Sequence, residues 1–137
     1  MPRVNGVLET ALYVKELERS REFYRDLFEL EVLAADDRFT ALSVAGKQVL
    51  LLFREGASRA PIATPTGIIP PHDGSGQTHF AFSISTADLA FWEQRLGEKG
   101  ISIESKMQWT RGGISIYFRD PDGHLVELAT PGIWAIY

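Results

Sequence analysis

Two stretches of the sequence, about 70 residues apart, carry the same order of secondary-structure signals. In each stretch an alternating apolar run predicts a strand, an apolar stripe at helical spacing follows, and three more alternating runs come after it. The predicted strands cover residues 7–14, 31–35, 38–44 and 48–53 in the first stretch and 77–85, 101–107, 114–119 and 124–130 in the second. The helical stripes lie within residues 17–28 and 89–96.

This repeat limits the folds that are open to the chain. One helix covers only one face of a sheet, so a single copy of the βαβββ order buries too little apolar surface to be stable alone. Two copies paired about a pseudo-twofold axis can instead form a half-barrel with a cleft between them. We therefore predict an α+β fold and one domain over residues 1–137, with module one at about 6–53, a loop at 54–76 and module two at about 77–130.

The segment between the two copies differs in composition. Residues 54–76 contain four prolines and four glycines. Long segments of this kind are usually linkers, disordered stretches or functional lids. We expect a mobile loop whose centre, Ile68–His72, can cover a pocket.

Charge and composition exclude several classes of function. Lys and Arg number 14 and Asp and Glu number 18, a formal net charge of −4, which argues against nucleic acid as a partner. The longest strongly apolar run, Val49–Phe53, is far shorter than the roughly 20 residues of a membrane span. The N-terminus lacks the apolar region of a signal peptide, so we expect a cytoplasmic protein. There is no cysteine, so a metal ion can be held only by His, Asp or Glu.

Three strands place one ionisable side chain on the face opposite their apolar residues. These are Glu9, His79 and Glu127, and an alanine follows each of them two positions later. Isolated ionisable groups on inward faces are costly unless they are paired or bind a metal. A divalent cation would satisfy all three together. Glu9 could instead pair with Arg3 or Arg111, and His79 could be a buried, hydrogen-bonded histidine.

Motifs over nearly the whole chain resemble one superfamily. They are Leu12–Val14 followed by Ser20–Tyr24, then Thr78–Phe82, and finally the long, specific run Tyr117–Glu127. The sequence on these motifs resembles the vicinal oxygen chelate superfamily, which includes glyoxalase I, extradiol dioxygenases, fosfomycin-modifying enzymes and bleomycin-binding proteins.

The resemblance implies a metal site at Glu9, His79 and Glu127. Glu9 departs from the histidine or glutamine that is more usual at its position. Aligning Gly46 with Gly123 places Leu50 opposite Glu127, so a fourth ligand is missing. Two carboxylates and one imidazole suit Mn, Fe, Zn, Co or Mg, and open positions on the ion would accept a substrate that chelates through two oxygens.

Further residues are candidates for catalysis and substrate binding. Tyr117 and Arg119 share a strand face directed to the cleft, where Tyr117 could hydrogen-bond a substrate oxygen and Arg119 could hold an anion. The alternative is a surface pair that stabilises a hairpin. Trp109 and Arg111 precede this strand and could line the mouth. We assign catalysis to Glu127 and Tyr117, and substrate binding to Tyr117, Arg119, Trp109 and Arg111.

The remaining ionisable candidates are interpreted as structural. We expect His72 and His124 to be solvated, since one lies in a loop and the other beside a turn. Asp120 and Asp122 belong to a tight turn and are expected to cap its backbone.

Two functions follow from these residues. The first is a metal-dependent enzyme acting on a small molecule, a lyase, isomerase or dioxygenase-like protein. The second is a metal-free binding protein that sequesters a drug or metabolite. We expect a homodimer, because exposed strand edges favour pairing.

Overall fold

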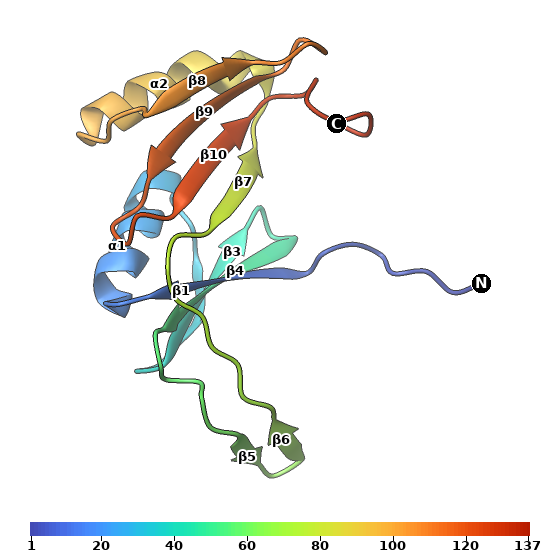
Figure 1. Cartoon of the computed structure of the whole chain (residues 1–137), viewed down its shortest axis with the longest axis vertical. Coiled ribbons are helices and arrows are strands. Elements are labelled where there is room, and N and C mark those ends of the chain that lie inside the picture. Colours follow the sequence, from blue (N-terminus) through green and yellow to red (C-terminus); the bar gives the residue numbers. More distant parts are fainter. The chain divides into compact units, whose positions relative to one another are not determined.

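The computed structural model describes all 137 residues and divides into two compact units, Met1–Gly76 and Gln77–Tyr137. Each unit is built around one open four-stranded sheet (Figure 1). No helix in the chain has the length and apolarity needed to span a membrane.

The first unit contains a mixed sheet with one long helix. Its sheet has the order β1-β4-β3-β2, in which β1 and β4 are parallel and the other pairs are antiparallel. A separate two-stranded hairpin, β5–β6, follows. The elements are β1 (Glu9–Val14), α1 (Leu17–Phe28), β2 (Val32–Ala35), β3 (Phe39–Val44), β4 (Gln48–Arg54), β5 (Ile62–Thr64) and β6 (Gly67–Ile69).

The second unit repeats this topology. Its sheet has the order β7-β10-β9-β8, and β7 and β10 form its parallel pair. The elements are β7 (His79–Ser83), the short 3₁₀ helix η1 (Thr86–Asp88), α2 (Leu89–Glu98), β8 (Ser105–Gln108), β9 (Ile114–Arg119) and β10 (Leu125–Ala129). The predicted α+β class and the repeated βαβββ order are confirmed.

Alternation along the strands separates a core face from a polar face, as predicted. In the first unit Leu12 and Val14 are buried, together with Tyr24 and Leu27 of α1. In the second unit the fully buried apolar side chains are Ile116, Phe118, Val126, Leu128 and Leu96. The opposite face of each sheet carries the ionisable candidates.

Three expectations about local structure are wrong. Residues 54–76 are not a plain loop, because Ile62–Thr64 and Gly67–Ile69 pair as a hairpin. The predicted strand 101–107 begins only at Ser105, because the chain at Ile101 still closes the end of α2 through its N–H bond to the Leu96 carbonyl.

The third correction concerns the missing fourth ligand. Glu127 lies opposite Ala81 in the β7·β10 pair, and Leu51 lies opposite Ala11 in the corresponding β1·β4 pair. The counterpart of Glu127 is therefore Leu51 and not Leu50, since the strand register and not the turn glycine fixes the equivalence. Leucine occupies the position in either alignment and cannot ligate.

Two glycines allow a close backbone contact in the second unit. The N–H of Gly113 donates to the carbonyl of Gly132 at 3.1 Å. A Cβ on Gly113 would lie 2.7 Å from the carbonyl carbon of Gly132. This contact joins the segment after β10 to the turn before β9.

Gly113→Ala is expected to lower the free energy of unfolding by about 1–3 kcal/mol, because backbone atoms must move to make room for the methyl group. Gly97→Ala is the matched control. Gly97 lies in α2 with open space at its Cβ position, and alanine there is expected to raise stability by roughly 0.5–1 kcal/mol. Urea denaturation of the two variants measures both effects, and equal midpoints would contradict the packing described here.

Candidate functional site

His79 and Glu127 meet on the polar face of the second sheet. His79 begins β7, and Glu127 lies in the adjacent strand β10, two residues beyond the partner of His79 in the parallel register. The His79 Nε2 and Glu127 Oε1 atoms are 3.2 Å apart. The side chain of Glu127 is only 10% exposed, whereas that of His79 is 49% exposed. The carboxylate is thus buried against the sheet, and the imidazole lies between it and solvent.

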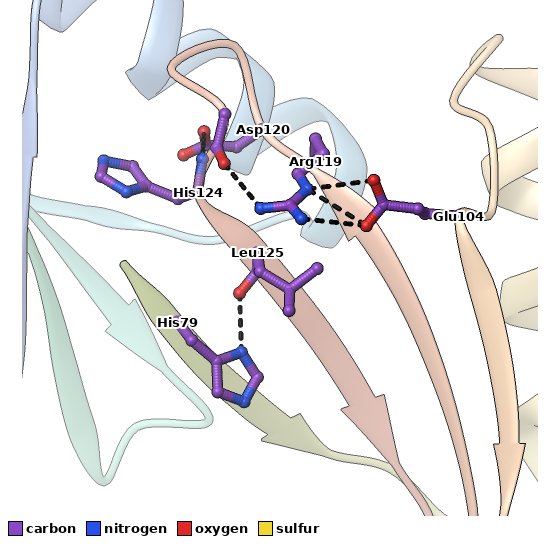
Figure 2. A network of polar contacts seen from close by, with 7 residues as sticks. His79, Glu104, Arg119, Asp120, His124 and Leu125 are labelled. Atoms are coloured by element: carbon purple, nitrogen blue, oxygen red, sulfur yellow. Dashed lines mark hydrogen bonds and ion pairs between the residues drawn. The ribbon is translucent and has the colours of Figure 1, made fainter. Parts of the chain in front are cut away.

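A backbone carbonyl orients the His79 ring. Its Nδ1 lies 2.9 Å from the carbonyl oxygen of Leu125 (Figure 2). A carbonyl oxygen can only accept, so Nδ1 carries a proton. The other ring nitrogen, Nε2, faces a carboxylate oxygen, so two lone pairs would oppose each other. A proton or a metal cation between the two atoms removes this repulsion. This arrangement of an oriented imidazole beside a carboxylate is typical of metal ligands.

A serine hydroxyl orients the other oxygen of Glu127. Trp109 Nε1 donates to Ser115 Oγ at 2.8 Å, and Ser115 Oγ donates to Glu127 Oε2 at 2.5 Å. An indole nitrogen can only donate, which leaves the serine proton for the carboxylate. Oε2 is thereby satisfied within the protein, and Oε1 remains for His79 or a ligand. Ser115 shares its strand face with Tyr117, but nothing in the sequence pattern indicates its contact with Glu127.

Tyr117 lies beside this pair. It is the antiparallel partner of Glu127 in β9, and its ring centroid is 6.3 Å from that of His79. Burial raises the pKa of the Tyr117 phenol, and the negative charge of Glu127 raises it further. The hydroxyl therefore stays protonated at neutral pH and can donate a hydrogen bond.

A mostly apolar cavity of about 300 Å³ opens on this pair. Its lining includes His79, Glu127 and the small residues Ala81 and Ala129. The other wall comes from the segment after β10, which the sequence did not identify: Ile133, Trp134, Ile136 and Tyr137. The Tyr137 hydroxyl lies 2.8 Å from the carbonyl oxygen of Ala129 and 3.1 Å from that of Ile84, which ties this segment to the sheet.

The other predicted substrate-binding residues lie elsewhere in the second unit. Arg119, at the exposed end of β9, pairs with Glu104 at 3.1 Å and donates to the carbonyl oxygen of Gly123 at 3.1 Å (Figure 2). These contacts favour the alternative in which Arg119 stabilises the hairpin. Trp109 is half-buried by its bond to Ser115, and Arg111 is exposed.

Glu9 belongs to the first unit and is described with it. Within that unit it makes no ion pair with Arg3, and it lines a cavity of about 490 Å³ on the face of the sheet opposite the core. No group of three or more His, Asp or Glu side chains is assembled as a metal site in the structure.

The prediction that His72 and His124 are solvated is wrong. His124 is only 1% exposed, and its Nδ1 accepts the N–H of Thr78 at 3.0 Å. His72 is half-buried, with its Nδ1 2.6 Å from the hydroxyl of Tyr13. The turn assignment of Asp120 is confirmed, since its Oδ1 accepts the N–H groups of Asp122 and His124.

Comparisons with known proteins agree with this architecture. The chain is 31% identical to a metallothiol transferase FosB of Shouchella clausii over 93% of this chain and 81% of that protein. It is 31% identical to a catechol-2,3-dioxygenase of Bacillus subtilis over 85% of this chain and 38% of that protein. The crystal structure of a lactoylglutathione lyase from Agrobacterium tumefaciens superposes with a TM-score of 0.89 at 33% identity, covering 98% of this chain and 99% of that one.

The family comparison extends over most of the sequence. Residues 6–128 match the family described as the glyoxalase/bleomycin resistance protein/dioxygenase superfamily. The repeated βαβββ units, the His79–Glu127 pair and this match lead to one conclusion: the chain belongs to the glyoxalase/bleomycin resistance protein/dioxygenase superfamily.

Proposed function

We propose that the chain is a metal-dependent enzyme that acts on a small molecule with two neighbouring oxygen atoms. The observation that carries the proposal is the His79–Glu127 pair, 3.2 Å apart, in which each side chain has its second polar atom already bound by the protein. The relatives support the class, since they carry the names of a metallothiol transferase, a lactoylglutathione lyase and a dioxygenase.

The residues present fit a divalent cation. Nδ1 of His79 and Oε2 of Glu127 are engaged, so Nε2 and Oε1 are the atoms left to coordinate. We propose Glu9 as the third ligand, in keeping with its lack of an ion-pair partner. Two carboxylates and one imidazole suit Mn, Fe, Zn, Co or Mg. When bound, such an ion acts as a Lewis acid that stabilises negative charge on substrate oxygens.

The protein side chains supply orientation and proton control. Trp109 and Ser115 hold the Glu127 carboxylate in place, and the Leu125 carbonyl holds the His79 ring. Tyr117, whose phenol remains protonated, donates a hydrogen bond to a substrate oxygen. The segment around Trp134 supplies an apolar wall for the substrate.

Other features of the enzyme are part of the same proposal. We propose that the two modules form one domain, that the protein works in the cytoplasm, and that it acts as a homodimer. Arg111 and Arg119 are the candidates for contact with the outer part of a substrate; Arg111 is exposed, and Arg119 is bonded to Glu104 and to the Gly123 carbonyl.

A metal-free binding protein is the second candidate. It is favoured by the apolar lining of the cavity next to His79 and by the direct 3.2 Å contact between His79 and Glu127, which involves no metal. In this function the cavity alone would retain a drug or metabolite.

His79→Ala is expected to reduce bound divalent metal to background without unfolding the protein. The side chain is about half exposed, so its removal leaves no buried cavity. Elemental analysis after dialysis against Mn²⁺ or Zn²⁺ measures the metal, and thermal denaturation checks the fold. Glu104→Gln, which alters an exposed carboxylate of the same unit, is the control and should keep the wild-type metal content. Stoichiometric metal in His79→Ala would contradict the proposed site, and wild-type protein that binds no metal would favour the binding protein.

Ser115→Ala is expected to weaken metal binding by about 10–100-fold, because partners of metal ligands typically contribute that much to affinity. The variant leaves Trp109 Nε1 and Glu127 Oε2 without their partner, which should also cost roughly 1–3 kcal/mol of stability. Competition titration with a metal-sensitive dye gives the affinity, and urea denaturation gives the stability. An unchanged metal affinity would show that Ser115 does not position Glu127 for a cation.

A further inference from the structure

The cavity on the first unit is lined by aromatic and basic side chains that have no role in the proposed metal chemistry. It measures about 490 Å³ and lies on the face of the sheet that carries Glu9. Most of its lining is apolar or aromatic, two residues are basic and one, Glu9, is acidic. The lining residues other than Glu9 are Arg38, Phe39, Leu51, Phe53, Ile69, Pro70, Pro71 and His72.

Specific contacts hold the wall in place. The segment after β6 returns to the sheet, where the N–H of His72 donates to the Ser58 carbonyl at 2.9 Å and its ring bonds the Tyr13 hydroxyl at 2.6 Å. The His72 ring meets the Phe53 ring edge-on, with centroids 4.4 Å apart. Gly74 packs so closely on the Tyr13 ring that a Cβ would lie 2.4 Å from it. The pocket is therefore preformed by side chains that are already engaged with one another.

Arg38 is the cation in this lining that lacks a partner. Its guanidinium carbon lies 5.1 Å from the centre of the Phe39 ring, a cation–π contact that fixes its direction. The side chain is half-buried and makes no ion pair or hydrogen bond, whereas the side chains of Arg54 and Arg59 in the same unit are both hydrogen-bonded. A guanidinium presents a planar fork of donors that matches a carboxylate.

We propose that this pocket binds the planar ring and carboxylate of an aromatic carboxylic acid, with Arg38 holding the carboxylate and Phe39 and Phe53 contacting the ring. One arginine suits a monoanion better than a phosphate, which usually requires several cations or a cluster of backbone N–H groups. The inference rests on the proposed function in one respect: it names the substrate class of that enzyme.

Binding of three small probes tests the proposal. Benzoate combines ring and charge, benzamide keeps the ring without the charge, and acetate keeps the charge without the ring. Ligand-observed NMR titrations with the full chain should show benzoate binding at least about tenfold more tightly than either of the others, because only benzoate uses both parts of the pocket. Equal affinities for benzoate and benzamide would overturn the role of Arg38.

Variants locate the binding site. Arg38→Ala should weaken benzoate binding by about tenfold or more and leave benzamide binding unchanged. Leu51→Trp places a large indole ring in the pocket and should abolish binding of both aromatic probes, because it occupies the space of their rings. Arg19→Ala, an exposed arginine on α1, is the charge-matched control and should bind benzoate as the wild type does. Benzoate binding that is insensitive to both pocket substitutions would place the ligand elsewhere and refute the assignment.

Running each titration after chelation and again with added Mn²⁺ separates the two proposals. Arg38-dependent benzoate binding in chelated protein supports the pocket whether or not His79 and Glu127 bind metal. Metal binding that depends on His79 in a protein that does not bind benzoate refutes the pocket and leaves the proposed function standing.

Discussion

The second unit is organised around one buried carboxylate. Glu127 is almost fully enclosed by strands, and an ionised carboxylate in such a place is costly unless every oxygen has a partner. Ser115 and His79 supply those partners, and Trp109 and the Leu125 carbonyl hold them in turn. The parallel register of β7 and β10 makes this possible, because it sets His79 and Glu127 two residues apart on one face.

The first unit has the same strands and a different polar face. Glu9 is the counterpart of His79, and Leu51 is the counterpart of Glu127. Glu9 therefore has no carboxylate beside it of the kind that His79 has. Apolar and aromatic side chains occupy that face instead, and Arg38 is its unpartnered cation. The second repeat therefore carries the paired imidazole and carboxylate, whereas the first carries Glu9 among apolar and aromatic side chains.

Much of the fold could be predicted from the sequence because strand periodicity reports burial directly. Alternation identified the core faces of the first and last strands, and it placed Glu9, His79 and Glu127 opposite them. The turn role of Asp120 followed from the chemistry of its turn. These predictions depend on neighbours in the chain or on a period of two, which a sequence shows.

What could not be predicted depends on contacts between distant segments. His124 is buried because Thr78, 46 residues away, bonds to it. Residues 54–76 contain a hairpin because Ile62–Thr64 pairs with Gly67–Ile69, and the proline and glycine content of the segment does not reveal this pairing. The wall formed by the residues after Ala129 has no periodic pattern, and its position follows from the Tyr137 hydroxyl reaching two carbonyl groups. Arg38 could not be distinguished from other arginines until its lack of a partner was visible.

The equivalence of Leu51 and Glu127 bears on how this architecture diversifies. Each position on the polar faces exists twice in the chain, and neither copy contributes to the core on the opposite side of its sheet. A codon change at such a position can add or remove a ligand without altering the core on the opposite side of the sheet. Selection can then explore coordination numbers and pocket polarity one repeat at a time, with the other repeat keeping its chemistry. Duplicated scaffolds of this kind are open to new reactions, in keeping with a family whose members bear names as different as lyase, transferase and dioxygenase.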